Sequence, residues 1–181
     1  MKLLIASDIH GDLESANLLF SAFGKEKCDK ILLLGDILYH GPRNDLPPTY
    51  NPKAVIELLN ANRNKILAVR GNCDTEVDQM VLDFPILADC SYLLLDELSI
   101  VATHGHRLNK ESPPPLRKGE ILLHGHTHLP TCQEFGDSNY YLNPGSIAIP
   151  KGGFPKTYMI YHNRRFTVKD FDCNIIFEKC F

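Results

Sequence analysis

The first seventy residues alternate between continuous apolar runs and segments whose apolar residues recur at helical spacing. Three such runs predict strands at 2–7, 31–34 and 66–69, and the run at 31–34 has the pattern of a strand buried on both faces. Helical spacing begins after Asp12 and again at Pro52, and Gly24 is the expected stop of the first helix. This β-α-β-α-β order predicts right-handed crossovers and a parallel sheet.

The pattern changes after a short predicted helix at 76–82. Two apolar segments, 92–95 and 99–102, are joined by a tight Asp96-Glu97 turn. Further strands are expected at 120–123, 140–142, 156–161, 166–171 and 175–177. We therefore expect an α/β fold in which these strands form a second sheet packed against the first, within a single domain spanning 1–181.

Composition narrows the classes of function. A net charge of −3 without a basic track argues against a protein that binds long nucleic acid. No segment approaches the roughly 20 apolar residues that a membrane span needs. The first apolar run stops at Asp8, too early for an export signal. Six irregularly spaced cysteines then indicate free thiols, so a cytoplasmic protein is expected.

Five polar motifs follow or interrupt the predicted strands. They are Ser-Asp-Ile-His-Gly at 7–11, Gly-Asp at 35–36, Arg-Gly-Asn-Cys-Asp at 70–74, Thr-His-Gly-His at 103–106 and Gly-His-Thr-His at 125–128. Strand ends of a parallel sheet open onto the same edge, where α/β proteins bind their ligands. Two carboxylates, four imidazoles and one amide at that edge are suited to two divalent cations.

Single motifs are less specific than the set. Asp-x-His often serves a turn or a helix cap, and Gly-Asn often forms a tight turn. If the chain stays extended through Ile9, Asp8 and His10 point the same way. Two carboxylates against two divalent ions leave a pocket of about +2, which attracts phosphate. A shared carboxylate between ions about 3.5–4 Å apart would let a metal-bridging hydroxide attack phosphorus in line.

The order of these motifs resembles that of the calcineurin-like metallophosphoesterases. Further segments are similar to the YfcE-type bacterial phosphodiesterases, at 40–44, 69–74, 125–130, 143–146 and 149–153. The resemblance runs nearly end to end. It implies a four-layer α/β/β/α sandwich of the metallo-dependent phosphatase type.

The resemblance also implies a binuclear ligand set. One metal falls to Asp8, His10, Asp36 and His128, and the second to Asp36, Asn72, His104 and His126, with Asp36 bridging. Mn²⁺ is the ion the family leads us to expect, whereas the ligands themselves also suit Zn²⁺, Fe, Co²⁺ or Ni²⁺.

Asn72, Cys73 and His104 are the expected catalytic residues. Cys73 stands where many metallophosphoesterases carry a histidine that can protonate the leaving group. A thiol with an ordinary pKa of about 8.5 is a poor replacement at neutral pH. We therefore expect preference for leaving groups that need little protonation, unless His104 or Asp74 compensates.

Arg70, Arg43 and Asn44 are the candidates for binding the phosphoryl oxygens or the ester group. For Arg43, a surface ion pair is an equally good interpretation. His106 and His124 are expected to support the site rather than ligate metal, although His106 could also touch substrate.

These observations favour a metal-dependent phosphodiesterase acting on a small or activated phosphodiester. A phosphomonoesterase or nucleotidase with the same metals is one alternative. Another is a protein-binding scaffold like the retromer-associated vacuolar-sorting subunit, although that relative departs from the catalytic pattern at the metal ligands. A nuclease for long nucleic acid is least favoured. The sequence leaves the natural substrate open, and a homo-oligomer is compatible with it.

Overall fold

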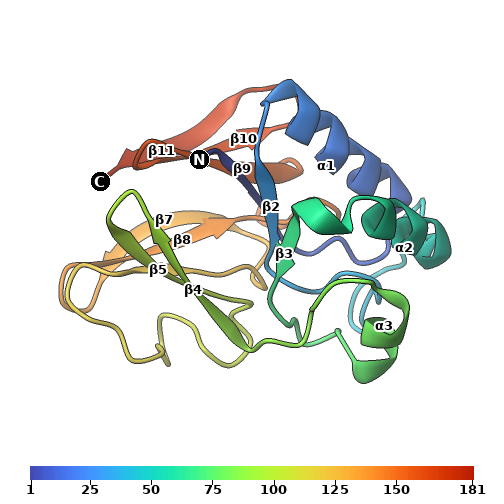
Figure 1. Cartoon of the computed structure of the whole chain (residues 1–181), viewed down its shortest axis with the longest axis horizontal. Helices are drawn as coiled ribbons and strands as arrows, with labels where there is room; N and C mark the ends of the chain where they lie inside the picture. Colours follow the sequence, from blue (N-terminus) through green and yellow to red (C-terminus); the bar gives the residue numbers. More distant parts are fainter.

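Two β-sheets lie face to face, and the helices cover the outer side of one of them (Figure 1). This computed structural model describes all residues, 1–181. The first sheet has the order β11-β10-β9-β1-β2-β3 and the second the order β4-β5-β6-β8-β7. The two-sheet sandwich expected from the sequence is confirmed.

The first sheet consists of β1 (Leu3–Ala6), β2 (Lys30–Leu33), β3 (Ile66–Ala68), β9 (Thr157–His162), β10 (Arg165–Asp170) and β11 (Ile175–Cys180). The second consists of β4 (Cys90–Leu95), β5 (Leu98–Thr103), β6 (Ile121–Leu123), β7 (Pro130–Phe135) and β8 (Asn139–Pro144). The helices are α1 (Leu13–Lys25), α2 (Pro52–Ala61) and α3 (Glu76–Val81), with a 3-10 turn at Arg63–Lys65.

The predicted β-α-β-α-β unit is confirmed, since β1, β2 and β3 pair in parallel. Helix α1 begins after Asp12, whose carboxylate accepts the Ser15 N–H. The expected stop at Gly24 is wrong, because α1 continues to Lys25. The chain turns away only at Lys27, which adopts a left-handed conformation with φ of 52°.

The sequence pattern suggested that the C-terminal strands belong to the second sheet. This prediction is wrong, because they join the first sheet. Strand β9 pairs antiparallel with β1, and β10 and β11 follow it, so the first sheet is mixed. Five of the six residues of β9 are buried. The physical reason is that β1 is apolar on both faces, and without β9 it would be an unprotected edge strand.

The sequence pattern did not predict strand β7, because this strand contains no apolar run. It lies at the edge of the second sheet, begins with Pro130, and has no buried residue. Proline is tolerated at such a position because an edge strand need not donate every backbone N–H.

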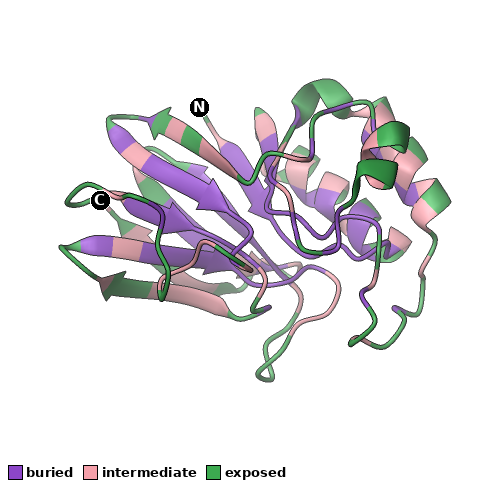
Figure 2. Ribbon diagram, turned by 90° about the horizontal axis from the view of Figure 1, so that it is seen from below, coloured by how far each residue is buried: buried purple, intermediate pink, exposed green.

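The central strands are largely buried (Figure 2), and their side chains alternate between two apolar cores. Leu4 of β1 packs against the helices with Leu19, whereas Ile5 packs against the second sheet with Ile100. A slip of one residue would exchange these two sets, so burial fixes the register of β1. The positions at which the central strands end are therefore fixed as well.

No helix covers the outer side of the second sheet, where Tyr92 and Leu94 of β4 remain exposed (Figure 1). Segment 115–117 lines a cavity of about 540 Å³ together with Tyr92 and Leu94 of β4.

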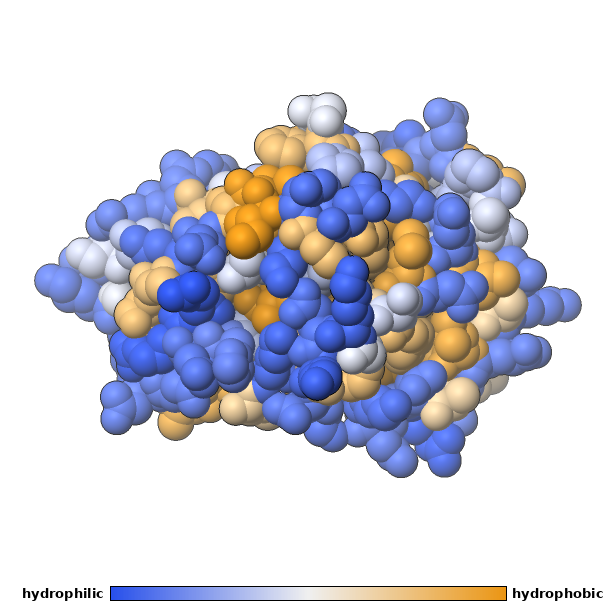
Figure 3. Space-filling view, turned by 90° about the horizontal axis from the view of Figure 1, so that it is seen from above, coloured by the Kyte–Doolittle hydropathy of each residue, from blue (hydrophilic) through white to orange (hydrophobic).

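None of the helices has the length and apolar character required to cross a membrane. The face shown in Figure 3 is mostly hydrophilic, with apolar residues in smaller patches.

Replacement of Asp12 by alanine should lower the free energy of unfolding by about 2 kcal/mol, the upper part of the range for helix caps. The carboxylate is buried, and besides capping α1 it accepts hydrogen bonds from Ser15, Thr49 and Lys156. Urea unfolding of the chelated protein measures the change. Asn51→Ala, which removes the exposed cap of α2, is the matched control and should cost about 1 kcal/mol. An equal cost for both variants would mean that the Asp12 network adds nothing beyond a cap.

Candidate metal centre

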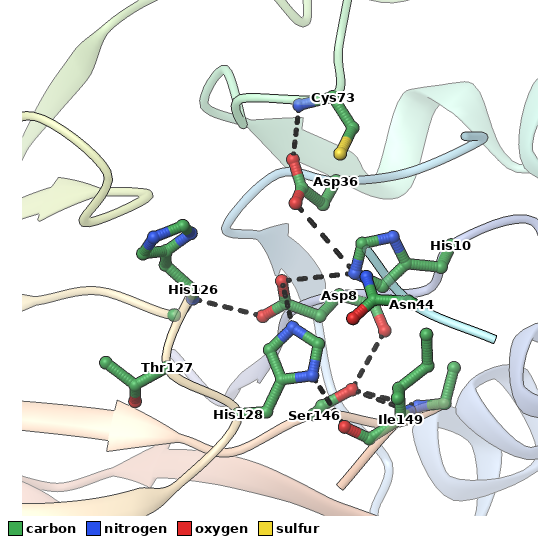
Figure 4. A network of polar contacts seen from close by, with 12 residues as sticks. Asp8, His10, Asp36, Asn44, Cys73, His126, Thr127, His128, Ser146 and Ile149 are labelled. Atoms are coloured by element: carbon green, nitrogen blue, oxygen red, sulfur yellow. Dashed lines mark hydrogen bonds and ion pairs between the residues drawn. The ribbon is translucent and has the colours of Figure 1, made fainter. Parts of the chain in front are cut away.

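The seven expected ligands come together at one edge of the sandwich. Figure 4 shows Asp8, His10, Asp36, His126 and His128 among them. Those from the first sheet follow β1, β2 and β3, and those from the second follow β5 and β6. In chain order they are Asp8, His10, Asp36, Asn72, His104, His126 and His128. The structure therefore brings together every residue that the sequence analysis selected as a ligand.

Five of these seven residues have a left-handed backbone. Their φ values are 62° for Asp8, 49° for His10, 55° for Asp36, 65° for His126 and 61° for His128. The expectation of an extended chain through Ile9 is therefore wrong, because the backbone turns sharply on both sides of it. Such conformations cost roughly 1–2 kcal/mol each in non-glycine residues and cluster at functional sites.

Backbone hydrogen bonds hold this turn in place. The N–H groups of Asp8 and His10 donate to the carbonyls of Gly35 (3.1 Å) and Asp36 (2.9 Å). The loops after β1 and β2 thus extend their pairing beyond the strands themselves. The side chains converge through this turn and not through strand alternation.

Asp8, His10 and His128 form the first ligand group. Nε2 of His128 lies 3.2 Å from Oδ1 of Asp8, and Nε2 of His10 lies 3.6 Å from the same oxygen. On its outer side, Nδ1 of His10 contacts the Tyr39 carbonyl at 2.8 Å, and Nδ1 of His128 contacts the Ile149 carbonyl at 2.5 Å. Because each Nδ1–H donates to a carbonyl, each Nε2 keeps its lone pair for the centre.

Asp36, His104 and His126 form the second group, together with Asn72. Nε2 of His104 lies 3.4 Å from Oδ2 of Asp36, 3.1 Å from Oδ1 of Asn72 and 3.2 Å from Nδ1 of His126. His104 donates from Nδ1 to the Leu34 carbonyl at 2.6 Å. Oδ2 of Asp36 also lies 3.8 Å from Nε2 of His10, so Asp36 stands between the two groups.

The chemistry of this cluster fits divalent cations. Oδ1 of Asp8 and Nε2 of His10 are buried and have no hydrogen-bond partner. Burying such atoms without a partner is costly, so sites of this kind usually bind something. The oxygen and nitrogen donors match the ions that carboxylate and imidazole prefer.

Electrostatics within the cluster favour ionised carboxylates. Burial opposes ionisation of Asp8, but His10 and His128 hold its pKa well below the ordinary value. Burial likewise opposes the charge on His104, yet Asp36 and Asp8 raise its pKa to about 9. Burial lowers the pKa of His126 to about 4, so this imidazole is neutral. The carboxylates therefore present full negative charge to the centre.

Asp74 supports the site in a way that the sequence analysis did not recognise. Its Oδ2 accepts the N–H groups of Asp36 (2.8 Å) and Gly71 (2.7 Å), and its Oδ1 accepts that of Ile37 (2.9 Å). This buried carboxylate thereby ties the loop after β3 to the loop after β2. The signal was present in the spacing of Gly-Asn-x-Asp, whose last residue is Asp74.

The thiol of Cys73 lies within 4.8 Å of possible ligand atoms of His10 and Asp36. Its backbone N–H donates to Oδ1 of Asp36 at 2.8 Å. Burial and the Asp36 carboxylate raise the pKa of the thiol above its ordinary value. At neutral pH the group is therefore a protonated, weakly acidic thiol at the centre.

A cleft of about 450 Å³ opens over both groups. Arg43 and Asn44 line it, as do Asn72, Cys73 and Lys151. Arg43 forms no ion pair with any carboxylate in the chain, in contrast to the surface pairing that was the alternative for it. Lys151 was not among the residues that the sequence analysis proposed.

The other proposed side chains lie outside the cleft. Arg70 contacts Oε1 of Glu76 at 3.3 Å and donates to the Asp74 carbonyl at 3.2 Å. His124 stacks on Tyr141 with ring centroids 4.1 Å apart. His106 lines a separate cavity of about 190 Å³ beside His104. These residues support the walls of the site, and none of them reaches the cleft over the two groups.

Comparisons with known proteins agree with this geometry. Residues 1–165 match the calcineurin-like phosphoesterase superfamily domain. The phosphodiesterase YfcE of Escherichia coli K12 is 46% identical over 163 residues, which cover 90% of this chain and 88% of YfcE. The solved structure of E. coli YfcE, described as a phosphoesterase, superposes with a TM-score of 0.95 at 44% identity and covers 99% of both chains.

A more distant structure shares the fold alone. Vacuolar protein sorting 29 from Cryptosporidium parvum has a TM-score of 0.64 at 17% identity, over 99% of this chain and 97% of that one. The two-sheet architecture therefore occurs in proteins whose sequences have diverged widely from this chain.

Replacement of Asp74 by asparagine should destabilise the chelated protein by about 1–3 kcal/mol, the cost of leaving a buried donor without an acceptor. The amide nitrogen would face an N–H group, since both carboxylate oxygens accept backbone hydrogen bonds. Urea unfolding measures stability, and calorimetric titration with Mn²⁺ should show weaker binding. Asp78→Asn, at the half-buried cap of α3, is the control and should leave Mn²⁺ affinity unchanged. If Asp74→Asn kept the stability and Mn²⁺ affinity of the wild type, the Asp74 carboxylate would not be needed to hold the two loops together.

Proposed function

The chain belongs to the calcineurin-like phosphoesterase superfamily, and from this premise we propose that it is a metal-dependent phosphodiesterase for small or activated phosphodiesters. One observation carries the proposal. Asp36 lies between the two ligand groups, 3.8 Å from Nε2 of His10 and 3.4 Å from Nε2 of His104. The buried Oδ1 of Asp8 and Nε2 of His10 form no hydrogen bond within the protein. The relationship to a phosphodiesterase at 46% identity supports the same conclusion.

We assign one metal to Asp8, His10, Asp36 and His128, and the other to Asp36, Asn72, His104 and His126. Asp36 is the shared ligand because it lies between His10 and His104. Mn²⁺ is the proposed ion, and the donor set suits Zn²⁺, Fe, Co²⁺ and Ni²⁺ as well. Bound divalent ions supply Lewis acidity, which neutralises charge on the phosphoryl oxygens.

The residues of the cleft orient the substrate. Arg43 is free to bind phosphoryl oxygens with its forked guanidinium, and Asn44 lies beside it. Asn72 and His104 hold each other at 3.1 Å next to the cleft, which limits the rotation of both side chains. Arg70 has no part in this proposal, because Glu76 and Asp74 engage its guanidinium.

The protonated thiol of Cys73 limits the choice of leaving group. Its raised pKa makes it a weak proton donor at neutral pH, weaker than a histidine in the same place. An ester whose leaving group departs as a stable anion needs no such donor. This supports activated phosphodiesters as the class that reacts fastest.

Two other functions can be distinguished from a phosphodiesterase by experiment. The same ligands would serve a phosphomonoesterase. A protein-binding scaffold is less consistent with the site, because all seven ligand positions carry competent donors. We further propose a cytoplasmic location, which is compatible with six cysteines that are all free thiols.

Chelation should abolish hydrolysis of bis-p-nitrophenyl phosphate, and Mn²⁺ should restore it. The diester should be preferred over p-nitrophenyl phosphate, measured as kcat/KM from release of p-nitrophenolate. Asp36→Asn, which weakens the shared ligand, should lose at least about a hundredfold, as removal of a metal-based term of several kcal/mol requires. Preference for the monoester would reassign the protein to the phosphatases. No turnover with bound metal would favour the scaffold.

Cys73→His should raise kcat on diesters with poor leaving groups by about tenfold or more, since a positioned general acid contributes about 10²–10⁴-fold at best. The phenyl and p-nitrophenyl esters of thymidine 5′-phosphate, which differ only in the leaving group, provide the comparison. The gain should appear mainly with the phenyl ester. Cys73→Ser, which keeps a small hydroxyl in place of the thiol, is the control. A gain that is equal for both esters would contradict a role in protonation.

A further inference from the structure

Lys151 lines the same cleft as the two ligand groups, on a segment that joins β8 to β9. Arg43 reaches the cleft from the loop after β2. Two basic residues from loops far apart in the chain therefore line the cleft over the ligand groups.

The backbone of Lys151 is anchored to a proposed ligand. Its N–H donates to the carbonyl of His128 at 3.3 Å, and its carbonyl accepts the N–H of Phe154 at 3.2 Å. Gly152 and Gly153 both have positive φ, 63° and 76°, which makes this tight turn possible. The segment that orients the His128 imidazole through the Ile149 carbonyl thus also positions Lys151.

The ammonium group of Lys151 has no partner within the protein. Lys151 forms no ion pair and no side-chain hydrogen bond, and the same is true of Lys27 and Lys53, but of these three only Lys151 lines the cleft. Arg43 likewise forms no ion pair. Asp36 is the only acidic residue lining the cleft, and it is buried among the ligand groups. Both cations are therefore available to a ligand in the cleft.

With two divalent ions bound, the positive charge of the cleft would exceed the single negative charge of a simple phosphodiester. Asp8 and Asp36 would offset half the charge of two divalent ions, and the attacking hydroxide would offset one more unit. Arg43 and Lys151 would then bring the excess to about +3. A phosphodiester carries a single negative charge. The remaining charge favours a substrate that has a second anionic group.

We propose that Lys151 is a substrate-binding residue that holds a second anionic group, a terminal phosphate, on the phosphodiester substrate. The substrate class is then a phosphodiester that also bears a phosphate monoester. This inference rests on the proposed function and adds the identity of the substrate to it. A single exposed cation against a phosphate dianion is expected to change KM rather than kcat, by about tenfold.

Two substrates with the same leaving group test this assignment: the p-nitrophenyl ester of thymidine 5′-phosphate, and the same ester with a 3′-phosphate. The wild-type enzyme with Mn²⁺ should prefer the 3′-phosphorylated ester about tenfold in kcat/KM, through KM, and salt should weaken the preference. Lys151→Gln should remove most of the preference. Lys53→Gln, an exposed lysine on α2 outside the cleft, should retain it. Equal preference in wild type and Lys151→Gln would overturn the proposal.

Binding gives a readout that does not depend on turnover. Thymidine 3′,5′-bisphosphate should raise the Tm of the Mn²⁺-loaded protein more than thymidine 5′-phosphate does, and Lys151→Gln should abolish the difference. If neither ester is hydrolysed but the bisphosphate still requires Lys151, the proposed activity fails while the anion site stands. If the bisphosphate binds wild type and Lys151→Gln equally well, the anion site itself is refuted.

Discussion

The site depends on the close approach of the two sheets at the contact between Ser7 and Gly125. A β-carbon on Gly125 would collide with Oγ of Ser7, so only glycine permits this distance. The approach lets the His126 N–H donate to Oδ2 of Asp8 at 3.2 Å and the Ser146 hydroxyl donate to the Asp8 carbonyl at 3.0 Å. Each sheet supplies only part of the ligand set, and the apolar core between them holds the two parts together.

Backbone strain is concentrated where the ligands lie. Left-handed residues recur at the ligand positions, and neighbouring loops hold them through backbone bonds to Gly35 and Asp36 and through the Asp74 carboxylate. The free energy for these conformations comes from burial in the two cores rather than from the loops themselves. In return, the imidazoles and carboxylates are fixed before any ligand arrives, which reduces the reorganisation that binding requires.

The polar groups in and around the centre differ in charge because their surroundings differ. Deep in the sandwich, acid–imidazole contacts keep Asp8 ionised, while at its side a buried thiol at Cys73 stays protonated. Toward solvent, the cleft ends in cations, Arg43 and Lys151, which nothing in the protein neutralises. Negative charge thus lies where metals fit, and positive charge lies where a phosphate would enter.

Most of the fold and nearly all of the candidate site followed from the sequence, and the exceptions share a physical cause. Apolar runs and strand-end motifs predicted the parallel unit and the candidate ligands, because burial and donor chemistry are properties of local residues. The pairing of β9 with β1, the edge strand β7 and the left-handed turn at Asp8 depended on neighbours distant in the chain. The same holds for Asp74 and Lys151, whose roles follow from contacts with other loops. The sequence by itself determined which groups are available for chemistry, whereas only the packing of the two sheets decided where they lie, since that depends on contacts between distant segments.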